Sequence, residues 1–203
     1  PAYLAYPACV SIAHGVPVLV PTYAKDEFRL TVEELEKKVT PKTKAILIGY
    51  PNNPTGTIMD RASLEKVAAF AKAHDLIVIA DEIYCDLTYE GQHTCFASLP
   101  DMQERTIVLN GFSKSYAMTG LRIGYVCAPR EALEEIYKVH QYEILCASTT
   151  SQYGAIEALR NCEDDVKAML EEYAARREMI YQGLVDIGLT VFKPKGAFYI
   201  FPD

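Results

Sequence analysis

The sequence predicts an α/β fold: a three-layer sandwich with a mostly parallel sheet, followed by the start of a smaller C-terminal α+β domain. Short, almost continuous apolar runs alternate with segments of helical periodicity. Strands without polar alternation are typical of sheets that are covered on both faces. Near the C-terminus, one long helical pattern precedes two new strand-like runs. We therefore expect a large domain at residues 1–163 and the beginning of a small domain at residues 164–203.

Five runs rich in β-branched residues are expected to form the strands of the large sheet. They cover residues 16–20, 45–48, 76–80, 106–109 and 123–127. Strands that alternate with helices are usually joined by crossover connections, which place them parallel in one sheet.

Capping residues and apolar spacing predict the helices. Thr31 with Glu34 forms a capping-box start. Asp60 is a candidate N-cap for a helix that places Leu64 and Val67 on one face. Further helices are expected at residues 129–140 and 164–184, and further strands at residues 189–192 and 197–201.

Composition excludes several classes of protein. The 203 residues are 50% hydrophobic with a net charge of −7, which disfavours disorder and binding to nucleic acid or anionic membranes. No apolar stretch has the length of a membrane span, and the chain does not open on a signal region. Six cysteines without a C-x-x-C pair and four scattered histidines predict a cytoplasmic protein without disulfides or a metal site. The chain opens on Pro1 and stops after an apolar run, so we expect a fragment of a longer protein.

Polar motifs follow three of the predicted strands directly. They are Gly49-Tyr50-Pro51-Asn52-Asn53-Pro54-Thr55-Gly56, Asp81-Glu82-Ile83-Tyr84 and Asn110-Gly111-Phe112-Ser113-Lys114-Ser115. Each motif alone has an ordinary interpretation, as a turn, a cap or a surface lysine. Because parallel strands end at one edge of a sheet, their joint occurrence predicts that an Asn, an Asp, a Tyr and a Lys converge there in a ligand site.

These three motifs, the last continued as far as Arg122-Ile123-Gly124-Tyr125, resemble the signatures of fold-type I pyridoxal-phosphate-dependent enzymes. The resemblance is closest to class I and II aminotransferases, and it extends from Pro1 to Asp203. It implies that the large domain binds pyridoxal 5'-phosphate and that the substrates are an amino acid and a 2-oxo acid. It also implies a homodimer in the full-length protein.

The resemblance assigns catalytic roles to residues of the second and third motifs. Lys114 would form a Schiff base with the cofactor and then transfer protons as general base and acid. Asp81 would keep the pyridine nitrogen protonated, so that the ring can accept electrons. Tyr84 and Asn53 would donate hydrogen bonds to the phenolic oxygen of the cofactor.

The remaining cofactor contacts implied by the resemblance are Arg122 and Ser113 on the phosphate and Tyr3 stacked on the ring. Two residues depart from the family pattern: Gly111 stands where many members have a phosphate-binding Ser, and Leu121 replaces a frequent Trp. Residues 144–146 also lack the Arg with which some dicarboxylate-specific relatives bind their substrate.

Two other functions remain open. The same Lys114, Asp81 and Tyr84 would serve a pyridoxal-phosphate-dependent C–S β-lyase of the cystathionase type. A non-catalytic, aminotransferase-like sensor domain is the second alternative. The resemblance places further substrate contacts in segments outside this chain, so we expect the isolated chain to be inactive.

Overall fold

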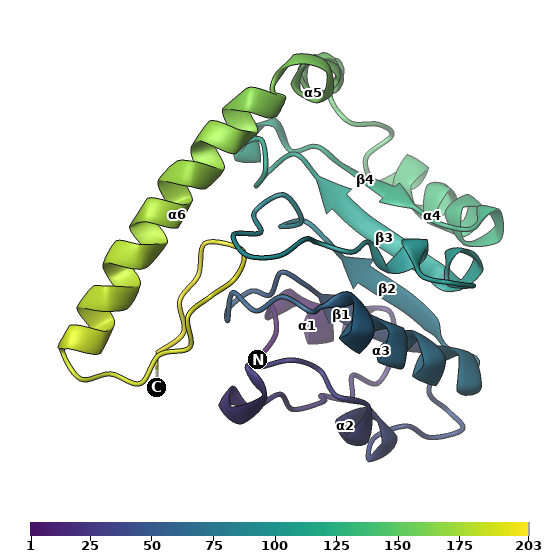
Figure 1. Cartoon of the computed structure of the whole chain (residues 1–203). Helices are drawn as coiled ribbons and strands as arrows, with labels where there is room; N and C mark the ends of the chain where they lie inside the picture. The colour runs from purple at the N-terminus through teal and green to yellow at the C-terminus, as the bar shows by residue number, and fades with distance from the viewer. Residues whose placement is uncertain (203) are drawn as a thin grey trace.

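The computed structural model describes residues 1–202, which fold around a four-stranded sheet (Figure 1). Its strands are β1 (Ala45–Gly49), β2 (Ile77–Asp81), β3 (Thr106–Gly111) and β4 (Gly124–Cys127). They lie in the order β1-β2-β3-β4. The first three are parallel, and β4 runs antiparallel to β3. The prediction of a mostly parallel sheet is confirmed.

The described residues also form six α-helices. They are α1 (Ala5–Ile12), α2 (Val32–Glu36), α3 (Arg61–Ala73), α4 (Arg130–Glu143), α5 (Thr149–Asn161) and α6 (Glu163–Asp186). The structure confirms the helices predicted after Asp60, at residues 129–140 and at residues 164–184, whereas α1 and α5 were not predicted. None of the helices in the described part of the chain has the length and apolarity needed to cross a bilayer.

Helix α3 covers one face of the sheet. It begins where the sequence predicted, because the Asp60 carboxylate accepts a hydrogen bond from the Ser63 N–H at 2.7 Å. Its apolar side chains, among them Val67 and Ala71, join a core cluster that includes residues of β1 and β2. This burial fixes α3 against the sheet.

Helix α1 lies toward the opposite face of the sheet. Ile48 is buried in the core beside α3, and successive side chains of a strand point to opposite faces. A Cβ atom built on Gly49 would come within 2.5 Å of the Tyr6 hydroxyl, so the α1 side chain closely approaches the second face. Helices on both faces match the predicted three layers.

The prediction of a strand at residues 16–20 is wrong. This segment has no regular secondary structure and pairs with no strand in residues 1–202, and Val16 is 85% exposed. A β-strand needs a neighbour to accept and donate its backbone hydrogen bonds, and none lies beside this segment. The helix start predicted at Thr31 is confirmed, since Thr31 is the N-cap residue of α2, but the capping-box hydrogen bonds are not formed: Thr31 makes no capping hydrogen bond with its side chain, and the Glu34 carboxylate pairs with Lys37.

Residues 189–202, here called the C-terminal segment, do not form the two predicted strands. Two isolated bridges occur there, between Val191 and Pro202 and between Thr88 and Gly196. The backbone N–H groups of Lys195 and Gly196 both donate to the carbonyl oxygen of Gly56 at 2.9 Å. The segment therefore docks on the loops that carry Gly56 and Thr88 instead of building a sheet. The domain division at residue 164 remains a prediction.

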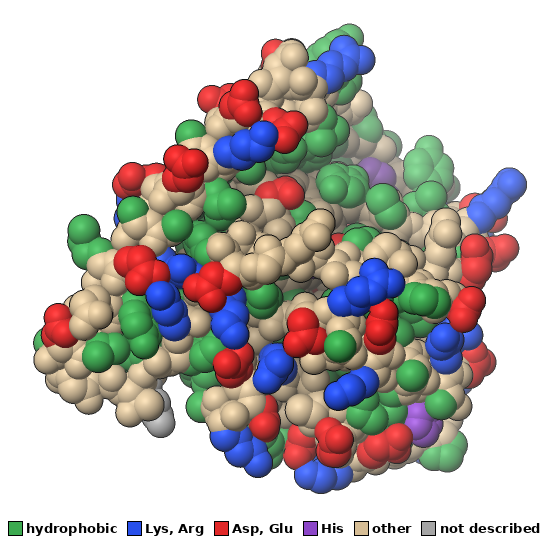
Figure 2. Space-filling model, in the orientation of Figure 1, with side chains coloured by type: hydrophobic (Ala, Val, Ile, Leu, Met, Phe, Trp, Pro, Cys, Tyr) green, Lys and Arg blue, Asp and Glu red, His purple; other side chains and the backbone are tan. Residues whose placement is uncertain are grey.

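The charge distribution agrees with the composition. On the face shown in Figure 2, acidic and basic side chains are interspersed over the surface of the molecule, without a continuous basic area. Such a surface offers no electrostatic footprint for a nucleic-acid backbone on this face.

Candidate active site

The three predicted motifs meet at the carboxyl edge of the parallel strands. Gly49 at the end of β1 pairs in register with Asp81 at the end of β2, and β3 ends at Gly111, three residues before Lys114. Ligand sites of open parallel sheets lie at this edge.

The loop after β1 is held rigidly by its first asparagine. Asn52 is buried, and its side-chain amide donates to the Gly49 carbonyl oxygen at 3.1 Å. Its side-chain oxygen accepts hydrogen bonds from the N–H and hydroxyl of Thr55, at 3.2 and 2.8 Å. Asn52 is thus a structural residue of the turn, whereas the side chain of Asn53 is directed elsewhere.

Asn53, Tyr84 and Lys114 are brought together, as predicted, but through a residue of the C-terminal segment. The Asn53 amide donates to the Tyr199 hydroxyl at 3.2 Å. The Tyr199 and Tyr84 hydroxyls lie 2.6 Å apart. The Lys114 Nζ is 5.9 Å from the centroid of the Tyr84 ring and 5.7 Å from that of Phe198. An amine therefore sits beside a cluster of hydroxyl and amide groups.

Asp81 is held by a residue that sequence reasoning missed. The Tyr6 hydroxyl donates to Asp81 Oδ2 at 2.7 Å, and the Ile83 N–H donates to Oδ1 at 3.2 Å. Burial raises the pKa of Tyr6, and the negative charge of Asp81 raises it further. Tyr6 is consequently a protonated donor at neutral pH, which fixes the orientation of the Asp81 carboxylate.

The phenol of Tyr84 is also kept protonated. Burial is the largest cause that raises its pKa, followed by the hydrogen bond with Tyr199 and the charge of Asp81. Nearby Cys85 has a pKa raised to about 11, chiefly by burial, so its thiol is not a nucleophile at neutral pH.

Tyr3 lies at the edge of the site and is 48% exposed. Its ring packs edge-on against Tyr6, with centroids 5.5 Å apart. The two tyrosines are three residues apart beside or within α1. That spacing places two side chains on the same side of a helix, and it is the sequence signal that could have found Tyr6.

The turn after β3 carries the other predicted contacts. The Lys114 carbonyl oxygen accepts from the Ala117 N–H at 3.2 Å, and Ser113 is half-buried on the same turn. Arg122 is exposed, and its guanidinium donates to the Thr119 carbonyl oxygen at 2.9 Å. Arg122 is thus tied to its own turn, and its exposed guanidinium has further N–H groups that can donate to an anion. Within residues 1–202, Arg122 forms no hydrogen bond or ion pair with Asn53, Tyr84 or Tyr199.

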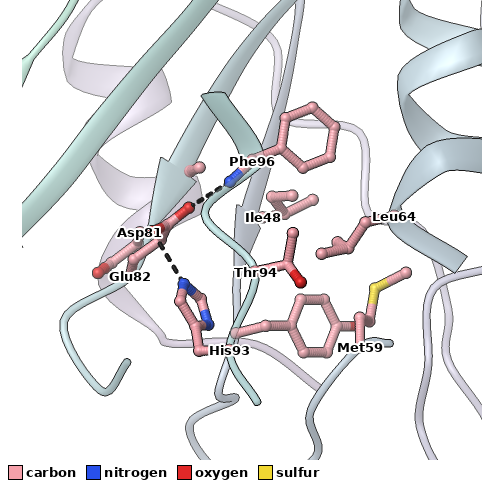
Figure 3. A pocket seen from close by; sticks show the side chains of 10 residues that line it. Ile48, Met59, Leu64, Asp81, Glu82, His93, Thr94 and Phe96 are labelled. Atoms are coloured by element: carbon pink, nitrogen blue, oxygen red, sulfur yellow. Dashed lines mark hydrogen bonds and ion pairs between the residues drawn. The ribbon is translucent and has the colours of Figure 1, made fainter. Parts of the chain in front are cut away.

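Glu82 follows Asp81 in the sequence, but its side chain lies beside residues of the core cluster that contains α3, such as Ile48 and Leu64 (Figure 3). Its carboxylate lies 2.9 Å from His93 Nε2 and accepts a hydrogen bond from the Phe96 N–H at 2.8 Å. The cavity beside it measures about 20 Å³, which suits one water molecule. Glu82 therefore anchors the 93–96 loop, and this cavity is too small for a substrate.

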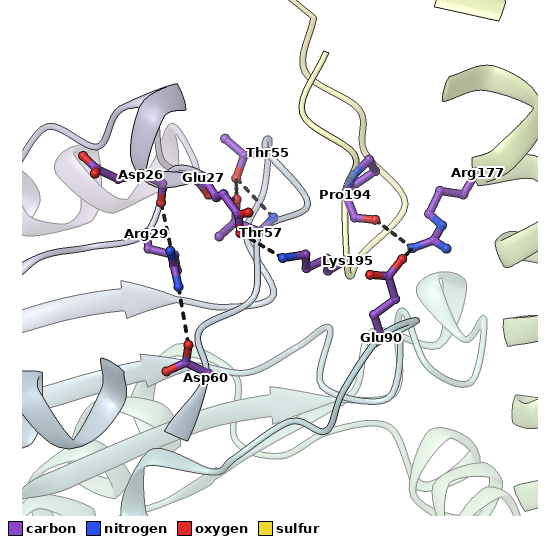
Figure 4. Close-up of polar contacts among 10 residues, drawn as sticks. All are labelled: Asp26, Glu27, Arg29, Thr55, Thr57, Asp60, Glu90, Arg177, Pro194 and Lys195. Carbon is purple, nitrogen blue, oxygen red and sulfur yellow. Dashed lines mark hydrogen bonds and ion pairs between the residues drawn. The ribbon is translucent and has the colours of Figure 1, made fainter. Parts of the chain in front are cut away.

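A salt bridge and a hydrogen bond tie the C-terminal segment to Glu27 and to Arg177 of α6 (Figure 4). Lys195 Nζ pairs with Glu27 at 2.9 Å. The Arg177 side chain, 11% exposed, bonds to the Glu90 carboxylate and to the Pro194 carbonyl oxygen, both at 2.9 Å. These contacts position Tyr199 against Tyr84 from 115 residues away in the sequence.

Comparisons with known proteins agree with this geometry. A family model described as aminotransferase class I and II matches residues 1–203. The chain is 48% identical over its full length to a putative aminotransferase, YugH, of Bacillus subtilis, and 47% identical to aromatic-amino-acid aminotransferase 2 of Thermococcus litoralis. In each case it spans 53% of the relative, so the chain covers about half the length of the curated relatives it matches.

Solved structures give the same result. An aromatic aminotransferase from Pyrococcus horikoshii superimposes with a TM-score of 0.98 at 48% identity, covering all of this chain and 55% of that one. A variant of the aspartate aminotransferase of Thermus thermophilus gives a TM-score of 0.94 at 37% identity, covering all of this chain and 53% of that one. With a family model that matches every residue, the chain belongs to the class I and II aminotransferase family.

Proposed function

We propose that the protein that contains this chain is a pyridoxal-phosphate-dependent aminotransferase, which moves an amino group from an L-amino acid to a 2-oxo acid. The observation that carries the proposal is the position of Lys114 Nζ, 5.9 Å from the ring centroid of Tyr84, whose hydroxyl is bonded to Tyr199. An amine, a carboxylate and hydrogen-bond donors at one strand edge are the groups that this reaction needs.

The donor set fits the chemistry of pyridoxal 5'-phosphate. Its aldehyde requires an amine, which Lys114 supplies. Its ring nitrogen requires an acidic partner, and Asp81 is held in one orientation by Tyr6 and by the Ile83 N–H. Its phenolic oxygen requires donors, and the Tyr84 hydroxyl lies in a cluster with the Asn53 amide. When bound, the group withdraws electrons from the bonds at the Cα of an amino acid.

The residues of the site would have different roles in the reaction. Lys114 would bind the cofactor covalently and, once released, hold and move the proton that leaves Cα. Asp81 would keep a proton on the ring nitrogen by its negative charge. Tyr84 and Asn53 would orient the ring by donating to its phenolic oxygen. Arg122 and Ser113 would bind the phosphate, and Tyr3 would lie against the ring.

The proposal extends to the assembly and the compartment. Family membership supports an amino acid and a 2-oxo acid as substrates and a homodimer as the assembly. The six cysteines in the described part of the chain are all free, which supports the reducing cytoplasm as the location.

Borohydride reduction tests the role of Lys114. Reduction fixes a cofactor that is bound to an amine, so mass spectrometry of the digested holoenzyme should find the cofactor on the Lys114 peptide. Lys114→Ala should abolish this label, whereas Lys138→Ala, at an exposed site on α4, should keep it. A Lys114→Ala protein that still traps the cofactor covalently would contradict the assignment.

Product analysis separates transamination from the C–S β-lyase alternative. An aminotransferase should transfer the amine only when a 2-oxo acid is supplied. A β-lyase should release pyruvate and ammonia from a cystathionine-type substrate without one. Cofactor fixed on Lys114 with neither activity in the full-length protein would favour the sensor domain.

A further inference from the structure

Tyr199 belongs to the C-terminal segment, yet its hydroxyl contacts two residues of the candidate active site. It lies 2.6 Å from the Tyr84 hydroxyl and accepts a hydrogen bond from the Asn53 amide at 3.2 Å. These partners are 115 and 146 residues away in the sequence. The hydroxyl therefore links both of the residues proposed to bind the phenolic oxygen of the cofactor.

Either hydroxyl of the Tyr84–Tyr199 pair can donate, so the direction of this hydrogen bond depends on what else each oxygen binds. A phenol has one proton and accepts through its lone pairs, and an amide nitrogen has two protons. Because Asn53 donates to Tyr199, the Tyr199 proton remains available for the Tyr84 oxygen. If Tyr199 donates, Tyr84 keeps its own proton for a third group. Hydrogen bonds in such a chain strengthen one another.

We propose that Tyr199 is a positioning residue, whose hydroxyl donates to Tyr84 and so directs the Tyr84 proton to the phenolic oxygen of the bound cofactor. This inference rests on the proposed function. Tyr199 acts through Tyr84: it makes Tyr84 a stronger donor and thereby stabilises the negative charge of that oxygen.

The backbone around Tyr199 holds it in place for this task. Ala197 is fully buried, and its N–H donates to the Leu87 carbonyl oxygen at 2.7 Å. The rings of Tyr84 and Tyr199 pack edge to face with centroids 5.6 Å apart. Gly56 permits the close approach, since a Cβ atom there would lie 2.9 Å from the Tyr199 carbonyl oxygen.

The charged and titratable groups around Tyr84 come from three other elements. Asp81 at the end of β2 raises the pKa of Tyr84 by its charge. Lys114 from the turn after β3 lies over the Tyr84 ring. Tyr6 from α1 binds Asp81. None of these residues changes in a Tyr199→Phe protein, which removes a single oxygen atom.

The experiment is a pH titration of the visible absorption of bound pyridoxal phosphate in the holoenzyme. In Tyr199→Phe the pKa read from this band should rise by about 0.5 to 1 pH unit, since a weaker donor stabilises the anionic oxygen less. Tyr153→Phe, which removes an equivalent hydroxyl at an exposed position on α5, should leave the pKa unchanged.

A double-mutant cycle tests whether Tyr199 acts through Tyr84. Tyr84→Phe should raise the pKa by more than Tyr199→Phe, and the double variant should titrate like Tyr84→Phe alone. Additive shifts, or an unchanged pKa in Tyr199→Phe, would overturn the inference. Failure of the proposed function would look different, because the unmodified protein would then show no visible band and no cofactor fixed by borohydride.

Discussion

The docking of the C-terminal segment depends on the absence of a side chain at Gly56, and Gly56→Ala tests this. Gly56 has a φ of +69°, and its carbonyl oxygen accepts from the N–H groups of Lys195 and Gly196. A Cβ atom at this position would lie 2.3 Å from the Pro194 Cβ and 2.9 Å from two backbone oxygens. Alanine therefore requires the segment to move away.

The loss of stability expected for the docked segment in Gly56→Ala has two contributions. The left-handed conformation destabilises a residue with a side chain by about 1 kcal/mol. Overpacking against backbone atoms adds about 1 to 3 kcal/mol. The total of about 2 to 4 kcal/mol corresponds to a change of about 30- to 1,000-fold in the equilibrium for local opening.

Amide hydrogen exchange of the full-length protein measures that opening directly. The N–H groups of Lys195 and Gly196 should exchange faster by this factor in Gly56→Ala. Gly188→Ala is the matched control, because Gly188 has a φ of +89° but no neighbour within 4 Å of an added Cβ. Gly188→Ala therefore has the destabilisation from the left-handed backbone conformation but not the steric overlap with neighbouring atoms. Equal protection of these two N–H groups in both variants would refute the reasoning.

Two further predictions concern stability. His93→Ala should destabilise the protein to urea by about 1 to 3 kcal/mol, because the buried Glu82 carboxylate keeps only the Phe96 N–H as a partner; unchanged stability would count against an anchoring role. Asp60→Ala should lower stability by about 1 kcal/mol through loss of the α3 cap, whereas Asp60→Asn should retain most of it. Hydrogen bonds from Ser63 lower the pKa of Asp60, so its contribution is complete above about pH 5 and is lost as the pH falls below about 4. Urea titrations above about pH 5 and below about pH 4 should show that the wild type loses stability at the lower pH and that Asp60→Asn loses less.

Local patterns were sufficient for much of the fold. Asp60 identified the start of α3 because an N-cap acts on the residues that follow it directly. Apolar runs located the strands at residues 45–48, 76–80 and 106–109, since a buried strand consists mainly of apolar and β-branched residues. The convergence of Asn53, Tyr84 and Lys114 followed from the parallel order of those strands.

Structural features that depend on residues far away in the sequence could not be predicted from these local patterns. Residues 16–20 have the composition of a strand, but strand formation requires a neighbour. The C-terminal segment has strand-like runs, yet its N–H groups are used by Gly56 and Leu87. Tyr199 was missed for the same reason, because nothing within the run 197–201 indicates a contact with Tyr84.

The departure at Gly111 has a structural cause in the packing of two strands. Gly111 on β3 pairs with Gly124 on β4. A Cβ atom on Gly111 would lie 2.8 Å from the Gly124 Cα and 3.1 Å from the Ile123 carbonyl oxygen. A serine at residue 111, as in many members of the family, would therefore require β4 to shift. With β4 at this distance, phosphate binding under the proposed function relies on Ser113, next to Lys114, and on Arg122, which follows the short helical turn at residues 119–121.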